Sequence, residues 1–456
     1  MSRSFDLLVR GATIVRPGDL IRADIAAVDG RIVKIGPNLA GDAGEVVDAS
    51  GLYVLPGIID SHVHFNEPGR SDWEGIETGS SALAAGGGTA FFDMPLNSLP
   101  PVTDAVSFAL KRAAGERSSR TDFALWGGLV PGNVDQLEAM RDAGAIGFKS
   151  FMCNSGVEEF PLADAATLRA GMKRAAALGM LVAVHAEDDS LARQGTEEQH
   201  RRGTDVRSWL KSRPVELELA AIRTAVDIAG ETGCALHIVH VSSPEGVALA
   251  GEAKAKGVDV SVETCPHYLL LNEEDVVRLG APAKCFPPLR PEALRIGLWQ
   301  ALGSGAIDTI GSDHSPAPPE MKRSEDFFAI WGGISGCQHG FELLLSEALG
   351  SAVPEVALSR LSRLFSANVA RRFRIDGMKG RLAEGLDADM TLIGIADGHI
   401  LSNADLLYRH RQGPYDGRKS NVRIERTIVR GSTVFSKGRI APGAPTGHFI
   451  RPTQRT

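Results

Sequence analysis

The residues with the clearest chemical potential are two histidines separated by a single residue. His62 and His64 end a short apolar run, with Val63 between them. Side chains alternate faces along a strand, so both imidazoles point the same way while Val63 points to the other side. Two neighbouring imidazoles are costly to bury without a shared ligand, and imidazole nitrogen is a common ligand of Zn²⁺. The pair therefore predicts half of a metal site.

A lysine lies among apolar residues in the stretch GFKSF, at position 149. A buried ammonium group needs a chemical reason. One reason is a salt bridge from Lys149 to a carboxylate. The other is reaction of the amine with CO₂, which gives a carbamate whose oxygens can bridge two metal ions. The lysine alone leaves both interpretations open, and the histidines favour the carbamate.

Three further candidate ligands each follow a short apolar run: His185, His240 and Asp313. His237 and His240 are three residues apart, so they face opposite sides of a regular strand and only one of them can face the site. His240 is nearer the end of its run and is the candidate, whereas His237 is expected to be packed or hydrogen-bonded. Asp313 alone could cap the segment that follows it, and its neighbour His314 is expected to be structural.

The candidate ligands are four histidines, one lysine and one aspartate, a set of nitrogen and oxygen donors without thiolate. Such donors suit Zn²⁺, with Mn²⁺, Co²⁺ or Fe²⁺ as substitutes. The five cysteines are an odd number without paired C-x-x-C spacing. This pattern argues against a disulfide framework and against a thiolate zinc site, and it favours a cytoplasmic location.

Eight short apolar runs alternate with stretches of helical length between residues 57 and 378. Near-continuous apolar runs are typical of strands buried on both faces, so the pattern predicts an α/β fold, a closed TIM-like (β/α)₈ barrel. Chemistry in such barrels lies at the C-terminal ends of the strands, and the candidate ligands follow the first, fourth, fifth, sixth and eighth runs. The predicted strands are Gly57–Phe65, Thr89–Pro95, Asp122–Leu129, Ala145–Met152, Met180–Ala186, Ala235–Val241, Asp259–Glu263 and Asp308–Ser312.

Both flanks of the barrel region show strand and hairpin patterns. In residues 1–56, the dipeptide Asp29-Gly30 between alternating apolar residues predicts a type I′ hairpin. In residues 379–456, a turn is expected at Gly431-Ser432, and an extended arm is expected after Arg439. We expect the two flanks to form one small β-sandwich module, with residues 57–378 as the barrel domain. The predicted flanking strands are Asp6–Val15, Ile25–Val28, Arg31–Ile35, Glu45–Val54, Asp389–Ile393, Arg426–Arg430 and Thr433–Phe435.

Composition narrows the range of partners. The chain has 456 residues, of which 43% are hydrophobic and 23% charged, as in globular proteins. The net charge is −7 and no long run of like charges occurs, so neither nucleic acid nor an anionic membrane surface is an expected partner. No apolar run reaches the roughly 18 residues of a membrane span, and the N-terminus has no apolar signal core. A small molecule is the expected ligand.

These spacings resemble those of the amidohydrolase superfamily, specifically its cyclic amidohydrolases. The resemblance covers essentially the whole chain, because that family also encloses its barrel within a small β module built from both termini. Five longer motifs are most similar to those of the allantoinase family. They are residues 60–70 (DSHVHFNEPGR), 93–98 (DMPLNS), 147–156 (GFKSFMCNSG), 263–268 (ETCPHY) and 331–335 (WGGIS).

The resemblance implies two divalent metal ions per subunit. His62 and His64 would bind the more buried ion, and His185 and His240 would bind the other. A carbamate derived from CO₂ on Lys149 is implied as the bridge between them. The resemblance also implies that four identical subunits form a homotetramer.

The resemblance also implies a reaction, the opening of the hydantoin ring of (S)-allantoin to give allantoate in purine and ureide catabolism. Asp313 is implied as a metal ligand and as the catalytic base, which takes a proton from the attacking water and returns it to the departing ring nitrogen. Two alternatives stay open. One is a hydantoinase or dihydropyrimidinase, and the other is a non-catalytic dihydropyrimidinase-like scaffold, which loss of metal ligands would mark.

Substrate choice is suggested by two departures from related families. Asn66 lies where dihydroorotases carry an arginine that holds a substrate carboxylate, so a neutral ring fits better. Asn154 lies where hydantoinases and dihydropyrimidinases carry a substrate-binding tyrosine. Phe286 occupies a position where relatives often have serine. Main-chain groups around Asn154, Phe286 and Gly336 are candidate substrate contacts, together with the side chain of Asn97.

Overall fold

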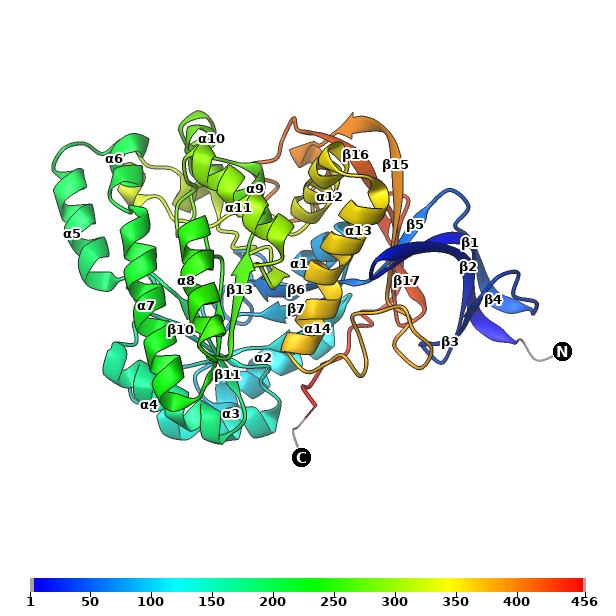
Figure 1. Cartoon of the computed structure of the whole chain (residues 1–456), viewed down its shortest axis with the longest axis horizontal. Coiled ribbons are helices and arrows are strands. Elements are labelled where there is room, and N and C mark those ends of the chain that lie inside the picture. The colour runs from blue at the N-terminus through cyan, green and yellow to red at the C-terminus, as the bar shows by residue number, and fades with distance from the viewer. Residues whose placement is uncertain (1–3, 454–456) are drawn as a thin grey trace.

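The computed structural model describes residues 4–453 and contains the predicted barrel (Figure 1). Its wall is made of parallel strands, each overlapping one of the eight predicted runs. Two short strands, β8 and β9, are consecutive parts of the third run, interrupted at Trp126. The barrel strands are β6 (Ile58–Val63), β7 (Gly88–Asp93), β8 (Asp122–Leu125), β9 (Gly127–Gly128), β10 (Phe148–Phe151), β11 (Leu181–His185), β12 (Ala235–Ile238), β13 (Val260–Thr264) and β14 (Thr309–Ile310).

The barrel wall consists of two hydrogen-bonded sheets. The first has the order β6-β7-β8, and the second runs from β9 to β14 in sequence order. The two sheets meet at two junctions, which close the barrel. At the first, the Trp126 N–H donates to the Asp93 carbonyl at 3.0 Å and the Gly127 N–H donates to the Gly147 carbonyl at 3.0 Å. At the second, the His64 N–H donates to the His314 carbonyl at 2.8 Å. The first and eighth strands therefore meet, which brings the distant ends of the barrel region to one mouth.

Helices cover the outside of the barrel (Figure 1). The longest of the described part, α7, shows why they form: its buried residues recur at helical spacing and face the strands. It begins after Pro214 and ends at Gly233, whose left-handed φ of 67° stops the helix. The helices are α1 (Ile76–Ala85), α2 (Ala105–Ser118), α3 (Leu137–Ala143), α4 (Ala165–Ala177), α5 (Asp189–His200), α6 (Val206–Lys211), α7 (Val215–Thr232), α8 (Pro244–Ala255), α9 (Pro266–Leu270), α10 (Glu273–Leu279), α11 (Glu292–Ser304), α12 (Gly340–Ser351), α13 (Pro354–Ser362) and α14 (Asn368–Arg372).

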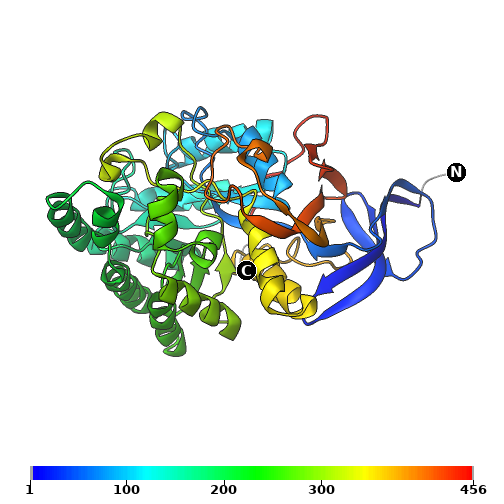
Figure 2. The same ribbon diagram turned by 90° about the horizontal axis from the view of Figure 1, so that it is seen from above.

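Strands from both ends of the chain form one continuous sheet beside the barrel, ordered β18-β17-β16-β15-β5-β1-β2-β3, with β4 paired to β1. The two ends meet where β5 pairs antiparallel with β15, Val54 opposite Leu392. Figure 2 shows the N-terminal and C-terminal strands side by side. The strands are β1 (Phe5–Arg16), β2 (Asp19–Val28), β3 (Arg31–Gly36), β4 (Ala43–Asp48), β5 (Tyr53–Pro56), β15 (Met390–Ile400), β16 (Lys419–Val429), β17 (Ser432–Ser436) and β18 (Arg439–Ile440).

The turns of this sheet confirm one prediction and correct two. Asp29 and Gly30 both have positive φ, 50° and 76°, as a type I′ turn requires. The second hairpin turns at Arg430 and Gly431, one residue earlier than predicted, because Val429 pairs with Ser432. The predicted strand Glu45–Val54 is two strands, β4 and β5, each parallel to β1.

The far end of the barrel, opposite the mouth, is tied to the sheet and to the C-terminal arm. The Phe123 N–H, at the start of β8, donates to the His448 carbonyl, and the Ile450 N–H donates back to the Phe123 carbonyl. Nearby, the ammonium group of Lys379 lies 2.7 Å from Asp122 of β8 and 2.5 Å from Asp389 beside β15. The predicted arm therefore packs against the barrel.

None of the helices in residues 4–453 is long and apolar enough to cross a membrane. All five cysteines are buried and free.

Candidate active site

A cavity of about 70 Å³ lies at the C-terminal ends of the barrel strands. A larger groove of about 500 Å³ adjoins it and shares Phe151, Ser155, His185, Phe286, Trp331 and Gly332 with its wall. Predicted ligands line the inner cavity, namely His62, His64, His185, His240 and Asp313. The barrel thus brings together residues that are up to 251 positions apart in sequence, from 62 to 313.

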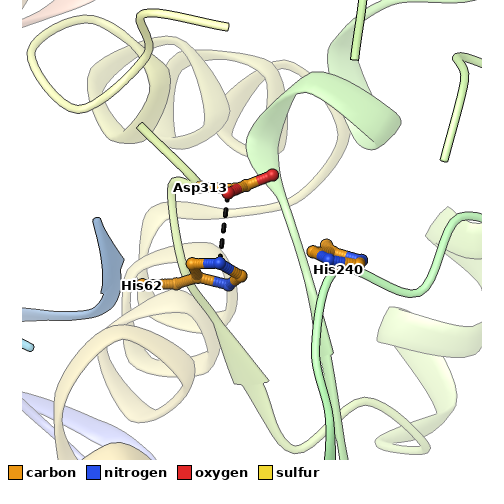
Figure 3. A group of neighbouring side chains, drawn as sticks. All are labelled: His62, His240 and Asp313. Carbon is orange, nitrogen blue, oxygen red and sulfur yellow. Dashed lines mark ion pairs between the residues drawn. The ribbon is translucent and has the colours of Figure 1, made fainter. Parts of the chain in front are cut away.

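His62, His240 and Asp313 form the centre of this site (Figure 3). One ligand atom from each lies within 4.8 Å of the others. The Nε2 atom of His62 is 3.1 Å from Oδ1 of Asp313, and the same oxygen is 3.4 Å from Nε2 of His64. His185 is adjacent, with its ring centre 4.6 Å from that of His240. Four imidazoles and one carboxylate therefore converge.

Lys149 lies fully buried on β10 beside these rings. Its Nζ atom has no hydrogen-bond partner within residues 4–453 and lies 5.0 Å from the ring centre of Phe151. Burial lowers the pKa of Lys149 to about 8, although the charges of Asp313 and Glu263 oppose that shift. The salt-bridge interpretation is therefore not supported by the structure. The shift favours the neutral amine, which is the form that adds to CO₂.

The pKa shifts of His64, His185, His240 and Asp313 favour the deprotonated forms that metal ligands require. Burial lowers the pKa of His64 to about 4 and also lowers the pKa values of His185 and His240. Burial alone would raise the pKa of Asp313, but the neighbouring His62 and His64 lower it to about 2. Neutral imidazoles and an ionised carboxylate are the forms that bind divalent cations.

Two glutamates that the sequence analysis did not assign orient these rings. Glu263, fully buried at the end of β13, lies 2.8 Å from Nδ1 of His62 and accepts a hydrogen bond from Ser61 at 2.6 Å. Glu187 lies 2.9 Å from Nε2 of His185. Carboxylates that bind the outer nitrogen of a ligating histidine fix its tautomer and direction. Their positions, Glu263 near the end of β13 and Glu187 two residues after the end of β11, were the signal in the sequence that could have identified them.

His237 and His314 lie as expected, outside the inner cavity. The Nδ1 atom of His237 is 2.7 Å from the hydroxyl oxygen of Ser261. His314 Nδ1 accepts a hydrogen bond from the Gly336 N–H at 3.1 Å. Both histidines are hydrogen-bonded within the protein, and of His237 and His240 only His240 lines the inner cavity.

Backbone strain gathers around the mouth. Four of the nine described non-glycine residues with positive φ are predicted site residues, namely Asn66, Asn97, His240 and Asp313, with φ of 64°, 68°, 42° and 46°. Such conformations typically cost about 1–3 kcal/mol each for residues other than glycine, and they persist only where the surrounding structure fixes them. The fold therefore holds these side chains in positions that a relaxed chain would avoid.

The candidate substrate contacts divide into two groups. Asn97 and Phe286 line the inner cavity, and Asn154 lines the outer groove. Asn66 and Gly336 are absent from both walls. Asn66 is buried and donates to the Pro316 carbonyl, while the Gly336 N–H and carbonyl are both used, the carbonyl by Gly340. The structure therefore does not support substrate contacts by Asn66 or Gly336.

Trp331 is a wall residue to which the sequence analysis gave no role. It lines both the inner cavity and the outer groove. Its indole ring lies edge-on to Trp73, with ring centres 5.0 Å apart. Its Nε1 atom has no hydrogen-bond partner in the part of the chain that the structure describes. The side chain thus occupies the junction between the two spaces.

Comparison with known proteins agrees with this geometry. Residues 53–434 match the model of the amidohydrolase family. The chain is 52% identical to an allantoinase of Rubrobacter xylanophilus and 49% identical to one of Deinococcus radiodurans, in each case over 98% of this chain and at least 98% of the relative. The solved L-hydantoinase of Arthrobacter aurescens superposes with a TM-score of 0.95 at 33% identity, covering 98% of this chain and 100% of that one. This chain belongs to the amidohydrolase family and, within it, to the allantoinases.

Proposed function

We propose that this chain hydrolyses the hydantoin ring amide of (S)-allantoin to allantoate, as a step of purine and ureide catabolism. The observation that carries the proposal is the convergence of four histidines, Lys149 and Asp313 at the mouth of a barrel. The near full-length identity to allantoinases supports the same substrate.

The residues fit two divalent metal ions, with Zn²⁺ as the first choice and Mn²⁺, Co²⁺ or Fe²⁺ as alternatives. Lys149 Nζ and His64 Nδ1 have no hydrogen-bond partner among residues 4–453, and these two atoms, together with the neutral imidazoles, support this fit. His62 and His64 would hold one ion, His185 and His240 the other, and a carbamate on Lys149 would bridge them. Asp313 would complete the set. When bound, such ions polarise the scissile carbonyl and lower the pKa of the attacking water to about 7.

The proton transfers fall to Asp313. Its pKa of about 2 keeps the carboxylate ionised at neutral pH, so it can accept a proton from the attacking water. The same group, once protonated, donates to the ring nitrogen as the amide C–N bond breaks. Glu263 and Glu187 hold His62 and His185 in place while this occurs.

The substrate is proposed to be a neutral ring with a hydrogen-bonding arm. The inner cavity, with Asn97 and Phe286 in its wall, would receive the hydantoin ring. The outer groove, with Asn154 in its wall, would receive the ureido arm. A second candidate function, hydantoinase or dihydropyrimidinase, is favoured by the likeness to the solved L-hydantoinase. The asparagine at position 154, where those enzymes carry tyrosine, counts against it.

A substrate panel tests the function. Allantoin, dihydroorotate, dihydrouracil and a 5-alkyl hydantoin are assayed with the same metal and pH. We expect the highest kcat/KM for allantoin, with one enantiomer favoured, and at least a tenfold loss for dihydroorotate, whose carboxylate has no arginine partner at position 66. Equal or better turnover of dihydrouracil would place the chain with the dihydropyrimidinases. Absence of turnover for all four would favour the non-catalytic scaffold.

The proposal also covers the cellular location, the oligomeric state and the domain division of the protein. We infer a cytoplasmic enzyme, which the five free cysteines support. We infer a homotetramer, as the family resemblance suggests, and light scattering on the purified protein tests it. We also infer that residues 1–56 and 379–456 form one module and residues 57–378 the barrel domain, a division supported by the single sheet that the two ends share.

A further inference from the structure

Two lysines near the mouth have no carboxylate within ion-pair distance in residues 4–453 and take no part in the chemistry above. Lys284 is fully buried, and Lys322 is partly buried. Burial and, to a smaller extent, the charge of Lys322 lower the pKa of Lys284 to about 7, and burial lowers the pKa of Lys322 to about 8. Two neighbouring cations in such a place are costly, so their hydrogen bonds must offset the lost hydration.

Both ammonium groups donate to main-chain carbonyls of one segment, Phe327–Gly333. Lys284 donates to Phe327 at 2.6 Å, to Phe328 at 3.2 Å and to Ile330 at 2.5 Å. Lys322 donates to Trp331 at 3.0 Å and to Gly333 at 2.7 Å. The Gly333 N–H in turn donates to the Lys284 carbonyl at 2.8 Å. A segment with little regular structure is thus fixed by five side-chain hydrogen bonds.

Lys284 also contacts the wall of the site directly. Its Nζ atom lies 5.5 Å from the ring centre of Phe286, which lines both the cavity and the groove. The rings of Trp209 and Phe327 lie at 5.2 Å and 5.1 Å from the same atom. Cation–π attraction of this kind fixes the relative position of a cation and a ring. The same lysine therefore holds Phe286 and the carbonyls of the neighbouring segment.

The segment matters because it carries Trp331 at the junction of the cavity and the groove. A flexible segment there would let the wall adapt to rings of different size. We propose that Lys284 and Lys322 are positioning residues that set substrate specificity by holding Trp331 and Phe286 against the substrate. The inference rests on the proposed hydrolytic function and adds to it the residues that shape its pocket.

The test uses a double-mutant cycle of Lys322 and Trp331 in the metal-loaded full-length enzyme. Lys322→Met removes the two hydrogen bonds to the segment and is expected to raise KM for allantoin about tenfold while kcat changes less than about threefold. Trp331→Ala removes the wall itself and is expected to raise KM at least as much. If Lys322 acts through Trp331, the double variant will have the KM of Trp331→Ala alone.

Matched variants exclude a general loss of structure. Lys322→Arg keeps a cationic donor and is expected to restore KM to within about threefold of the parent. Lys254→Met removes an exposed lysine that is paired with Asp308 at the opposite end of the barrel. We expect this change to leave KM unaltered, both in the parent enzyme and in Trp331→Ala. Multiplicative effects of Lys322→Met and Trp331→Ala, or a loss confined to kcat, would overturn the proposal.

Failure of the proposed function gives a different result. An unaltered enzyme that prefers another cyclic amide would contradict allantoin as the substrate, and the same cycle would then be measured with the preferred compound. Non-additive KM values with that compound would still support the positioning role, and additive values would refute it.

Discussion

At the scale of single residues, the surroundings of Lys149 and Asp313 shift both groups toward the forms that react. Both are buried, yet the pKa of Lys149 is lowered to about 8 by desolvation and that of Asp313 is lowered to about 2 by the neighbouring histidines. A neutral amine can be carboxylated, and an ionised carboxylate can accept a proton. Each side chain can therefore be tested through the property that its surroundings set.

Replacement of Lys149 by alanine tests its part in metal binding. We expect metal content to fall from about two ions per chain to one or fewer, with loss of turnover, because the bridging oxygens are gone. Elemental analysis of protein purified without chelator measures this. A small added carboxylic acid is expected to restore part of the activity. Two retained ions and normal turnover in Lys149→Ala would show that the lysine is only structural.

Replacement of Asp313 by asparagine tests proton transfer. Asparagine has nearly the same shape but cannot take up the proton, so we expect turnover to fall by about 10²–10⁴-fold with an unchanged fold. Steady-state kinetics of the metal-loaded variant, with circular dichroism as a structural control, give the answer. Turnover equal to that of the parent at neutral pH would remove Asp313 from the mechanism.

At the scale of elements, strand ends bring acids and imidazoles together across the barrel. β13 supplies Glu263, which holds His62 from β6, and this contact joins positions 201 residues apart. The position of Glu263 on β13 thus determines the orientation of the His62 ring on β6.

Replacement of Glu263 by glutamine tests this coupling. The amide cannot act as the anionic acceptor for His62, so we expect metal affinity to fall about 10–100-fold while the strand remains formed. Equilibrium dialysis against a metal-buffered solution measures the affinity. Glu342→Gln is the matched control, because Glu342 on α12 is also buried but does not line the cavity or the groove, and burial raises its pKa to about 7. Equal losses of affinity in the two variants would argue against a specific role of Glu263.

The elements were more predictable from sequence than their side-chain partners. Apolar runs are local signals, so all eight barrel strands could be located. Alternation indicated that only one of His237 and His240 faces the site, and position nearer the end of the sixth run selected His240. The contact of Glu263 with His62 depends on the closed barrel, and no local pattern contains it. For the same reason, Asn66 was expected at the substrate but is buried against Pro316. Hairpin position was predicted only to within one residue at Gly431.

At the scale of the whole molecule, Lys379 joins the barrel to the sheet. Its ammonium group is ion-paired with Asp122, Asp387 and Asp389, and the side chains of Lys379 and Asp122 are each only 2% exposed. Removal of one partner from such a cluster leaves uncompensated buried charge, which usually costs several kcal/mol. The cluster lies at the end of the barrel away from the mouth, so stability and catalysis can be separated there.

Replacement of Lys379 by methionine is expected to lower the free energy of unfolding by about 3–5 kcal/mol, since three carboxylates lose the lysine that they share, although Asp122 keeps the guanidinium of Arg430 at 3.1 Å. Urea denaturation followed by circular dichroism measures the change. The exposed ion pair of Lys254 with Asp308 serves as the comparison. Lys254→Met is expected to lower the free energy of unfolding by less than about 1 kcal/mol. We expect unchanged kcat in the folded Lys379→Met enzyme, and similar stability losses in the two variants would contradict the role of the cluster.

The pairing of β5 with β15 has a consequence for synthesis of the chain. Pro56 at the end of β5 pairs with Met390 at the start of β15, and 334 residues separate them (390 − 56). At a translation rate of about 5–20 residues per second, roughly 20–70 s pass between the appearance of the two strands on the ribosome. During that time the outer edge of β5 has no partner strand, so the barrel is made first and the sheet is completed only when the last tenth or so of the polypeptide has emerged.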